Sequence, residues 1–371
     1  MDRTESQLMQ FAIAIQANIP TILWGSPGEA KSALISKVFE RLDWPYEIIL
    51  GSIMDPTDVG GWPVDAGEAG IKRRAPQWAM KLSKERLGNN PGGLFLEELN
   101  LAPKAVQAAM MRVVHDRVVG DMELGVNVAR VAAANPIEES AGGWLFDPPM
   151  ANRFFHMKWS LTFEYWQQAA MTGFPLPSVV KLNPKWREVN LPQQKAMCLA
   201  YLNAHRTAFK DIPKSDNDRS GPFPTPRSWT LGWTLLGAAA SIGAAEEIQV
   251  ELLGGCVGQH HALQYNEWRS KLNLPDPEQV LAKPGKVQWP QRGDKVYAIL
   301  TSVAAAILGN NTPERWERGW QVWAAAADTH KDIAAAVAKS MVPSRPKGSK
   351  IPKEADVFYD AMAKAGLVPT R

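Results

Sequence analysis

The feature of this 371-residue sequence that most constrains its fold is a short glycine-containing loop between an apolar run and a helical pattern. The run IPTILW leads into GSPGEAKS (residues 25–32), and ALISKVFERL follows. Gly25 and Gly28 let the backbone turn its N–H groups toward one anion, and the positive end of the following helix strengthens that attraction. The pattern predicts a phosphate-binding loop whose contacts come from Gly25, Ser26, Pro27, Gly28, Glu29, Ala30, Lys31, Ser32 and Leu34.

Within this loop, we expect Lys31 to reach the β- and γ-phosphates of a nucleotide and the Ser32 hydroxyl to bind Mg²⁺. Ala30 occupies the position before the lysine, where glycine is more common. An alanine with negative φ is tolerated there, so this residue weakens the motif without removing it. The alternative is an ordinary glycine turn followed by a solvated lysine.

A second apolar stretch, GGLFLEELN (residues 92–100), ends in two carboxylates. At the end of a buried strand, Glu97 could assist the metal and Glu98 could act as the base that polarises an attacking water. Glu97 is one methylene longer than the more usual aspartate, which favours looser or water-mediated metal contact. The alternative is the solvated start of a helix at LEELN.

Three further polar residues follow in order along the chain. Asn135 ends the apolar run VAAANP, where its amide could orient a water beside a γ-phosphate. Arg153 precedes another strand, a position suited to reaching the γ-phosphate of a neighbouring subunit. Arg227 falls in the first turn of a helix that Thr225 caps and Pro226 begins. Taken singly each is more often structural, but their order behind the loop and the carboxylates favours a catalytic set.

The apolar pattern indicates an α/β class for the N-terminal part of the chain. Residues 1–160 alternate strands with amphipathic helices, which predicts a domain around a parallel sheet. Residues 161–224 mix short helices with proline-marked loops and end in a flexible connector, SDNDRSGPFP (215–224). Residues 225–371 are predicted to be helical. The expected strands are Thr21–Trp24, Tyr46–Leu50, Gly93–Leu96, Val128–Ala134 and Phe154–Trp159.

Composition excludes several classes of protein. The formal net charge of +3 gives no overall basic signature for nucleic acid. Two distant cysteines, Cys198 and Cys256, predict neither a zinc site nor a disulfide framework and favour a cytoplasmic location. No stretch reaches the roughly 20 apolar residues of a membrane helix. Most of the tryptophans lie beyond residue 140, and we expect them mainly in packing.

With these motifs the chain resembles AAA+ ATPases, and among them the MoxR branch, which includes RavA-like proteins with alanine before the loop lysine. The resemblance rests on GSPGEAKS, LFLEELNLAPKAVQAAMMRVVHDR, VAAANP, MANRF and PTPRSW. It implies a P-loop αβα sandwich with a five-stranded parallel sheet, followed by an all-α lid and a helical C-terminal extension. It also implies that Asn135 is sensor 1, Arg153 the arginine finger and Arg227 sensor 2.

Two insertions are similar to those of the MoxR branch. Residues 55–82 resemble its helix-2 insert, and residues 113–136 resemble the hairpin before sensor 1. Because such insertions line or crown the pore of a ring, the resemblance makes Trp62, Lys72, Arg73 and Arg74 candidate contacts for a substrate or partner. The alternative is a Trp62 packed inside its insert beside a solvated charged face.

The resemblance implies a homo-oligomeric ring, expected to be hexameric, that hydrolyses Mg-ATP to remodel or activate a protein client. A separate von Willebrand A domain protein is the expected partner, and GTP stays open as a substrate. One alternative is a nucleic-acid motor or restriction-type ring, using residues 72–74 and PSRPKGSKIPK. Another is an ATP-gated scaffold with weak hydrolysis, suggested by Glu97 and by Asn152, which replaces the acidic residue usual before the finger arginine.

Overall fold

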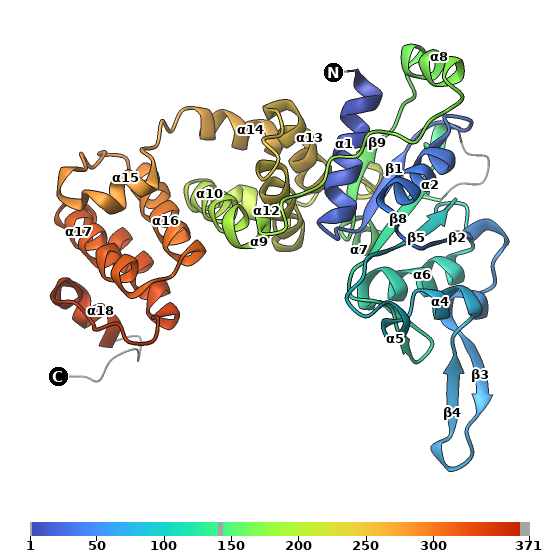
Figure 1. Ribbon diagram of the computed structural model, residues 1–371, viewed down its shortest axis with the longest axis horizontal. Helices are drawn as coiled ribbons and strands as arrows, with labels where there is room; N and C mark the ends of the chain where they lie inside the picture. Colours follow the sequence, from blue (N-terminus) through green and yellow to red (C-terminus); the bar gives the residue numbers. More distant parts are fainter. Residues whose placement is uncertain (1, 140–143, 364–371) are drawn as a thin grey trace. The chain divides into compact units, whose positions relative to one another are not determined.

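The computed structural model describes residues 2–139 and 144–363, which divide into two compact units (Figure 1). Unit 1 comprises the chain up to Leu182, together with Asp211–Leu235 and Ile242–Gln259. Unit 2 comprises Asn183–Lys210, Leu236–Ser241 and the chain from His260 onward.

Unit 1 is built on a five-stranded sheet in the order β2-β5-β8-β1-β9, in which every pair is parallel. This confirms the predicted α/β class and sheet. β5 extends one residue further at each end than expected, and β9 is one residue shorter at each end. The strands are β1 (Thr21–Trp24), β2 (Tyr46–Leu50), β5 (Gly92–Glu97), β8 (Val128–Ala134) and β9 (Phe155–Lys158).

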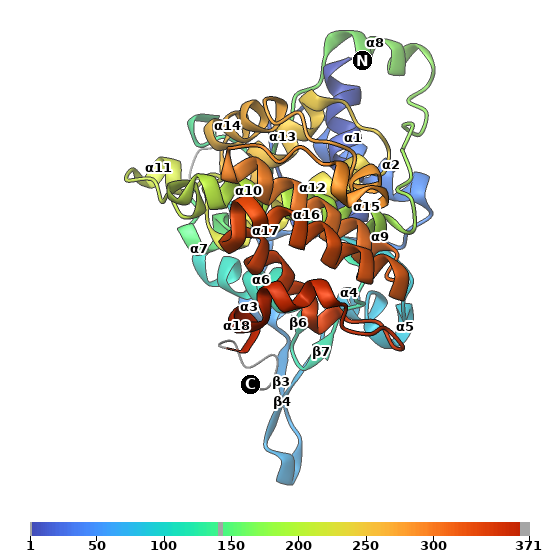
Figure 2. The same cartoon turned by 90° about the vertical axis from the view of Figure 1, so that its left-hand side faces the viewer.

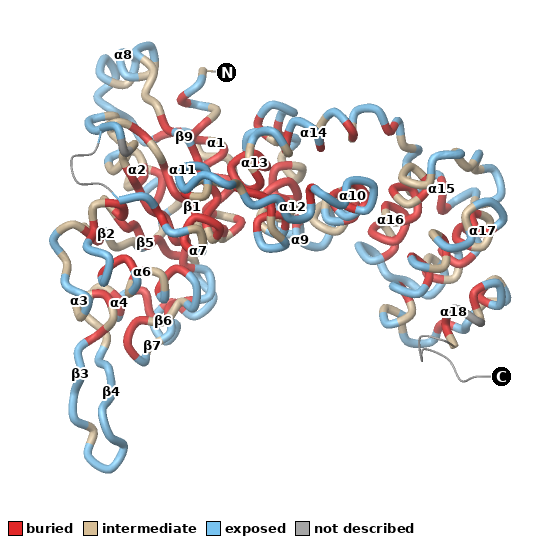
Figure 3. Tube along the Cα trace, turned by 180° about the vertical axis from the view of Figure 1, so that it is seen from behind, coloured by how far each residue is buried: buried red, intermediate tan, exposed pale blue. Residues whose placement is uncertain are grey.

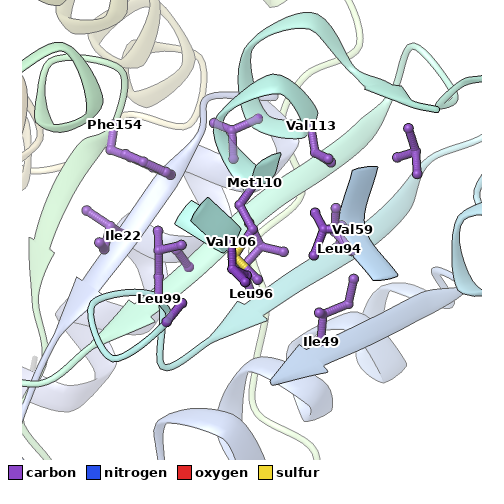
Figure 4. Close-up of a cluster of buried hydrophobic side chains, with 14 of the residues drawn as sticks. Ile22, Ile49, Val59, Leu94, Leu96, Leu99, Val106, Met110, Val113 and Phe154 are labelled. Atoms are coloured by element: carbon purple, nitrogen blue, oxygen red, sulfur yellow. The ribbon is translucent and has the colours of Figure 1, made fainter. Parts of the chain in front are cut away.

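Helices cover both faces of this sheet. On one face Phe39 of α2 (Lys31–Leu42) packs so closely on Gly93 that a Cβ there would lie 2.7 Å from its ring. On the other face, α3 (Pro56–Gly60) and α6 (Lys104–Asp116) pack on Leu94 and Leu96 in an apolar cluster (Figure 4). Alternate strand residues point to opposite faces, so β5 supplies both contacts.

The remaining elements of unit 1 surround this core or extend from it. Two antiparallel hairpins, β3–β4 and β6–β7, lie in the segments predicted as insertions. The bounds are α1 (Arg3–Gln16), η1 (Gly51–Ile53), β3 (Trp62–Asp65), η2 (Gly67–Ala69), β4 (Ile71–Arg74), α4 (Gln77–Lys81), α5 (Lys84–Leu87), β6 (Val118–Val119), β7 (Met122–Glu123), η3 (Ile137–Glu139), α7 (Pro148–Ala151), α8 (Phe163–Met171), α11 (Asp216–Arg219), α12 (Pro226–Ala240, in unit 1 up to Leu235) and α13 (Glu246–Val257).

The expected flexible connector at residues 215–224 is wrong. α11 lies inside it, and the chain then packs against unit 1 with Ser220 and Phe223 buried. Ser220 accepts a hydrogen bond from the Phe146 N–H at 2.9 Å. Glycine and proline in this segment therefore shape a fixed path instead of providing mobility.

Unit 2 is helical, as the sequence predicts for most of this region. Its core contains the fully buried Trp316, Trp320 and Trp323, whose spacing of four and three residues places them on one side of α17. No helix among the described residues is long and apolar enough to cross a membrane. The bounds are α9 (Trp186–Val189), α10 (Leu191–Ala204), η4 (Arg206–Phe209), α14 (Gln259–Ser270), α15 (Pro277–Ala282), η5 (Pro284–Lys286), α16 (Gly293–Gly309), α17 (Pro313–Met341), η6 (Val342–Ser344), η7 (Lys353–Phe358) and α18 (Tyr359–Ala363).

A buried histidine joins strand β1 to the end of α7 in unit 1. Trp24 Nε1 donates to His156 Nδ1 at 3.0 Å, and the other ring nitrogen of His156 lies 2.8 Å from the Ala151 carbonyl. A neutral imidazole protonated at Nε2 satisfies both contacts, because it accepts from the indole and donates to the carbonyl. Desolvation lowers the pKa of His156 to about 4, against the opposing effect of the Ala151 hydrogen bond.

We predict that His156 makes the protein less stable in acid. Between about pH 6.5 and 4 the unfolded chain binds a proton on this ring that the folded chain does not, so the free energy of unfolding falls as the pH falls. The loss is about 3 kcal/mol across this window. Urea unfolding at pH 7 and pH 4 should show a smaller pH dependence for His156→Gln than for the wild type. The exposed His115→Gln serves as the control, and an equal pH dependence in wild type and His156→Gln would contradict the assignment.

Candidate nucleotide-binding site

The carboxyl ends of β1, β5 and β8 place the predicted motifs around one pocket of about 400 Å³. Parallel strands end at the same edge of a sheet, so residues distant in sequence meet there. Gly25, Ser26 and Leu34, predicted as contacts, lie outside the lining. The lining residues are Pro27, Gly28, Glu29, Ala30, Lys31, Ser32, Ala33, Glu97, Glu98, Ala133, Ala134 and Asn135.

Lys31 is held at the centre of the loop. Its Nζ donates to the carbonyls of Gly25 and Ser26 at 2.7 and 2.8 Å, and to Asn135 Oδ1 at 3.0 Å. Desolvation lowers the pKa of Lys31, while the charges of Glu29, Glu139 and Glu97 oppose that effect. The lysine and the sensor candidate Asn135 are therefore already in contact.

The loop backbone suits an anion. None of the N–H groups from Gly28 to Ser32 donates a hydrogen bond within the described part of the chain, and they lie at the positive end of the 12-residue helix α2. Trp159 holds the loop backbone through one hydrogen bond, which its Nε1 donates to the Glu29 carbonyl at 2.9 Å. The residues present therefore fit a phosphate group.

Ala30 differs from the expectation of a negative φ. Its φ is +55°, in the left-handed region, immediately before α2 begins. A Cβ in that region costs about 1 kcal/mol that a glycine avoids. The loop therefore has the backbone path of a glycine-containing loop although an alanine occupies this position.

The two carboxylates at the end of β5 have separate partners. The Ser32 hydroxyl hydrogen-bonds Glu97 Oε1, which brings together the two residues predicted to bind Mg²⁺. Glu98 has a φ of +53°, and its Oε2 accepts from the Ser52 hydroxyl at 2.5 Å. The described residues contain no group of three His, Cys, Asp or Glu side chains that could hold a metal ion.

Ser52 is a site residue that the sequence reasoning missed. It lies in η1, directly after β2, and β2 pairs with β5 so that Leu50 is opposite Glu97. A polar residue just after a strand is a usable signal, but the chain order does not reveal that these two strands are neighbours.

Arg153 and Arg227 lie outside the lining of the pocket. Desolvation lowers the pKa of Arg153, the charge of Arg227 lowers it further, and Asp116 opposes both effects. Arg153 Nε is buried and has no hydrogen-bond partner among the described residues. Both arginines therefore belong to unit 1 without lining the chain's own phosphate pocket.

Asn152 holds the two arginine-bearing segments together. Its Nδ2 donates to the Phe223 carbonyl at 3.1 Å, and its Oδ1 accepts from the Thr225 hydroxyl at 2.7 Å. Thr225 also caps α12, where it accepts from the Ser228 N–H at 3.1 Å, as predicted. An aspartate at position 152 could not make the first of these bonds, which is a physical reason for the departure from the acidic residue.

The hairpin β3–β4 extends from unit 1 with its residues exposed to solvent (Figures 2 and 3). The alternative of a packed Trp62 is wrong, because its side chain is 57% exposed. Trp62 pairs with Arg74 and Val64 with Lys72, so these four side chains share one face. Arg73 lies on the opposite face.

A phosphate loop, a strand ending in carboxylates and a polar strand end lie in this order on one parallel sheet, an arrangement that suits nucleotide binding. In agreement, residues 20–154 match the family described as AAA domain (dynein-related subfamily). A crystal structure of a candidate ATPase from Cytophaga hutchinsonii is similar at 14% identity, covering 69% of this chain and 84% of that chain. Its TM-score of 0.47 is too low to establish a shared fold. No curated protein matches the sequence.

We predict that Asn152→Asp destabilises the protein by about 1–3 kcal/mol, because it places a carboxylate oxygen against the Phe223 carbonyl where an N–H donor stood. Urea unfolding at neutral pH measures the change. Asn89→Asp makes the same chemical change on an exposed residue and should have little effect. Equal midpoints for the wild type and Asn152→Asp would show that this bond contributes nothing to stability.

Proposed function

We propose that unit 1 hydrolyses ATP at the pocket of the 25–32 loop. The observation that supports this most is the joint lining of one pocket by Lys31, two strand-end carboxylates and Asn135. Lys31 and the loop N–H groups bind the phosphates, and Asn135 orients the attacking water. Glu98, released from Ser52, accepts a proton from that water.

Ser32 and Glu97 are the residues that would hold Mg²⁺, which supplies charge neutralisation on the phosphates. Their contact supports this assignment. GTP is the alternative substrate, since none of the motifs reads the base.

The position of the two arginines supports action between subunits. Arg153 lies outside the lining of the pocket of its own chain, as expected for a group that acts on the nucleotide of a neighbour, and its Nη1 donates to the Pro149 carbonyl in the single chain. Arg227, in the first turn of α12, would report the nucleotide state to that helix. We therefore propose a homo-oligomeric ring, with six subunits as the expected number.

The work of this ring is proposed to be remodelling or activation of a protein client, in the manner of the MoxR-type ATPases that the chain resembles. The exposed face of the β3–β4 hairpin, with Trp62, Val64, Lys72 and Arg74, is the proposed contact for a client or for a separate von Willebrand A domain protein. An exposed tryptophan beside cations also suits nucleic acid, and DNA binding that weakens steeply with salt would favour the motor alternative.

We predict that Glu98→Gln lowers ATP turnover about 10²- to 10⁴-fold while ATP binding persists, because the amide cannot accept the proton. Steady-state phosphate release and equilibrium binding of a fluorescent ATP analogue measure the two properties. Glu123→Gln, an exposed carboxylate on β7, is the matched control. If wild type and Glu98→Gln are equally inactive although the ring assembles on ATP, the chain is a nucleotide-gated scaffold instead.

We predict that mixing two inactive variants restores ATP turnover if Arg153 acts on a neighbouring subunit. Arg153→Ala alone should lose about 10³- to 10⁵-fold in turnover. In a 1:1 mixture with Lys31→Ala, an Arg153→Ala subunit beside a Lys31→Ala subunit has an intact loop and receives an intact arginine. About a quarter of the wild-type rate should return. As a control, Arg153→Ala is mixed with the double variant Lys31→Ala/Arg153→Ala, which supplies no intact arginine. Action between subunits is contradicted if the mixture of Arg153→Ala with Lys31→Ala recovers no turnover.

A further inference from the structure

Unit 2 contains a cavity of about 550 Å³ that has no connection to the nucleotide chemistry. It lies among α15, η5 and the N-terminal part of α16, which belong to unit 2 alone. Leu272, Val280 and Ile299 form a floor in which each side chain is almost fully buried. A cavity of this size with an apolar floor is typical of a ligand site.

Three lysines from three different elements line this cavity. Lys283 follows α15, Lys286 ends η5 and Lys295 lies in the first turn of α16. The lining contains no aspartate or glutamate, and none of the three lysines forms an ion pair within the described residues. The three amines bring positive charge to one lining, so each of them attracts an anion bound there.

Other cations close by in the same unit are paired. Arg315 forms a bidentate ion pair with Glu278, with N–O distances of 2.7 and 2.8 Å. Arg292 Nη2 lies 2.6 Å from Asp294 Oδ2. Three acidic residues adjoin lining residues in sequence, and all have local partners: Glu278 binds Arg315, Asp294 binds Arg292, and Asp276 accepts from the Glu278 N–H. These neighbouring carboxylates are therefore engaged outside the lining of the cavity.

The lining indicates which anion fits. It contains no aromatic ring and no arginine, the groups on which nucleobases stack. Its cations are lysines, which act as point charges and do not impose the fork geometry of arginine. Asn273, Gln279 and Gln288 add amide groups that can donate to and accept from a peptide backbone.

We propose that this cavity binds an acidic peptide segment of a partner protein, with aliphatic side chains on the floor and carboxylates at Lys283, Lys286 and Lys295. The site would attach a client or partner to the helical unit. It does not rest on ATP hydrolysis, so its failure and the failure of the proposed ATPase activity are separate results.

Fluorescence anisotropy of the full chain with a labelled peptide of alternating Glu and Leu tests the proposal. We expect saturable binding that weakens as salt rises, and a loss of about tenfold or more in the triple variant Lys283→Gln/Lys286→Gln/Lys295→Gln. The control Lys331→Gln/Lys339→Gln/Lys347→Gln changes three exposed lysines of the same unit and should bind as the wild type does. If the first triple variant unfolds, Lys283→Gln/Lys286→Gln alters exposed positions alone and should still weaken binding.

Several results would overturn the proposal. The first is that the wild type does not bind the Glu–Leu peptide. The second is that both triple variants lose peptide affinity equally, and the third is that a peptide with Gln in place of Glu binds equally well. Equal binding of a Glu–Gly peptide would remove the role of the apolar floor. Tighter binding of oleate or of a short oligonucleotide at the same lysines would assign the cavity to a lipid or a nucleic acid instead.

Discussion

The parallel pairing of β1 with β8, and of β8 with β5, is the constraint on which the candidate site depends. In this register Trp24 lies opposite Ala134 and Leu96 opposite Ala132, so the three strands end at nearly the same level. The residues that follow those ends are the loop, the carboxylate Glu98 and Asn135. A register slip of two residues in either pair would move Asn135 or Glu98 by a strand repeat of roughly 7 Å and separate the lysine from its partners.

Two buried polar side chains extend this arrangement beyond the pocket. His156 connects the strand before the loop to the end of α7, and Asn152 connects the turn after α7 to the start of α12. Arg153 lies between these two residues in sequence. Because buried polar groups are costly unless their hydrogen bonds are made, these contacts define the path of the arginine-bearing turn more sharply than apolar packing would.

Much of the core domain could be predicted from the sequence. The 25–32 loop, the five strands and the cap of α12 follow from local patterns, because each depends on residues that are close in the chain. The left-handed φ of Ala30, the burial of residues 220–224 and the exposure of Trp62 did not follow. Each of them depends on neighbours supplied by distant parts of the chain, which local composition does not show.

The sequence by itself determined the chemistry available to this protein: a lysine and a serine on a phosphate loop, paired glutamates, and an asparagine and two arginines in a fixed order. Tertiary structure alone decided which of these residues meet. It placed Ser52 against Glu98, joined Lys31 to Asn135, left both arginines outside the lining of the loop's pocket, and gathered three lysines around an apolar cavity. The reason is physical, because side-chain chemistry belongs to each residue whereas proximity depends on strand order and helix packing across the whole unit.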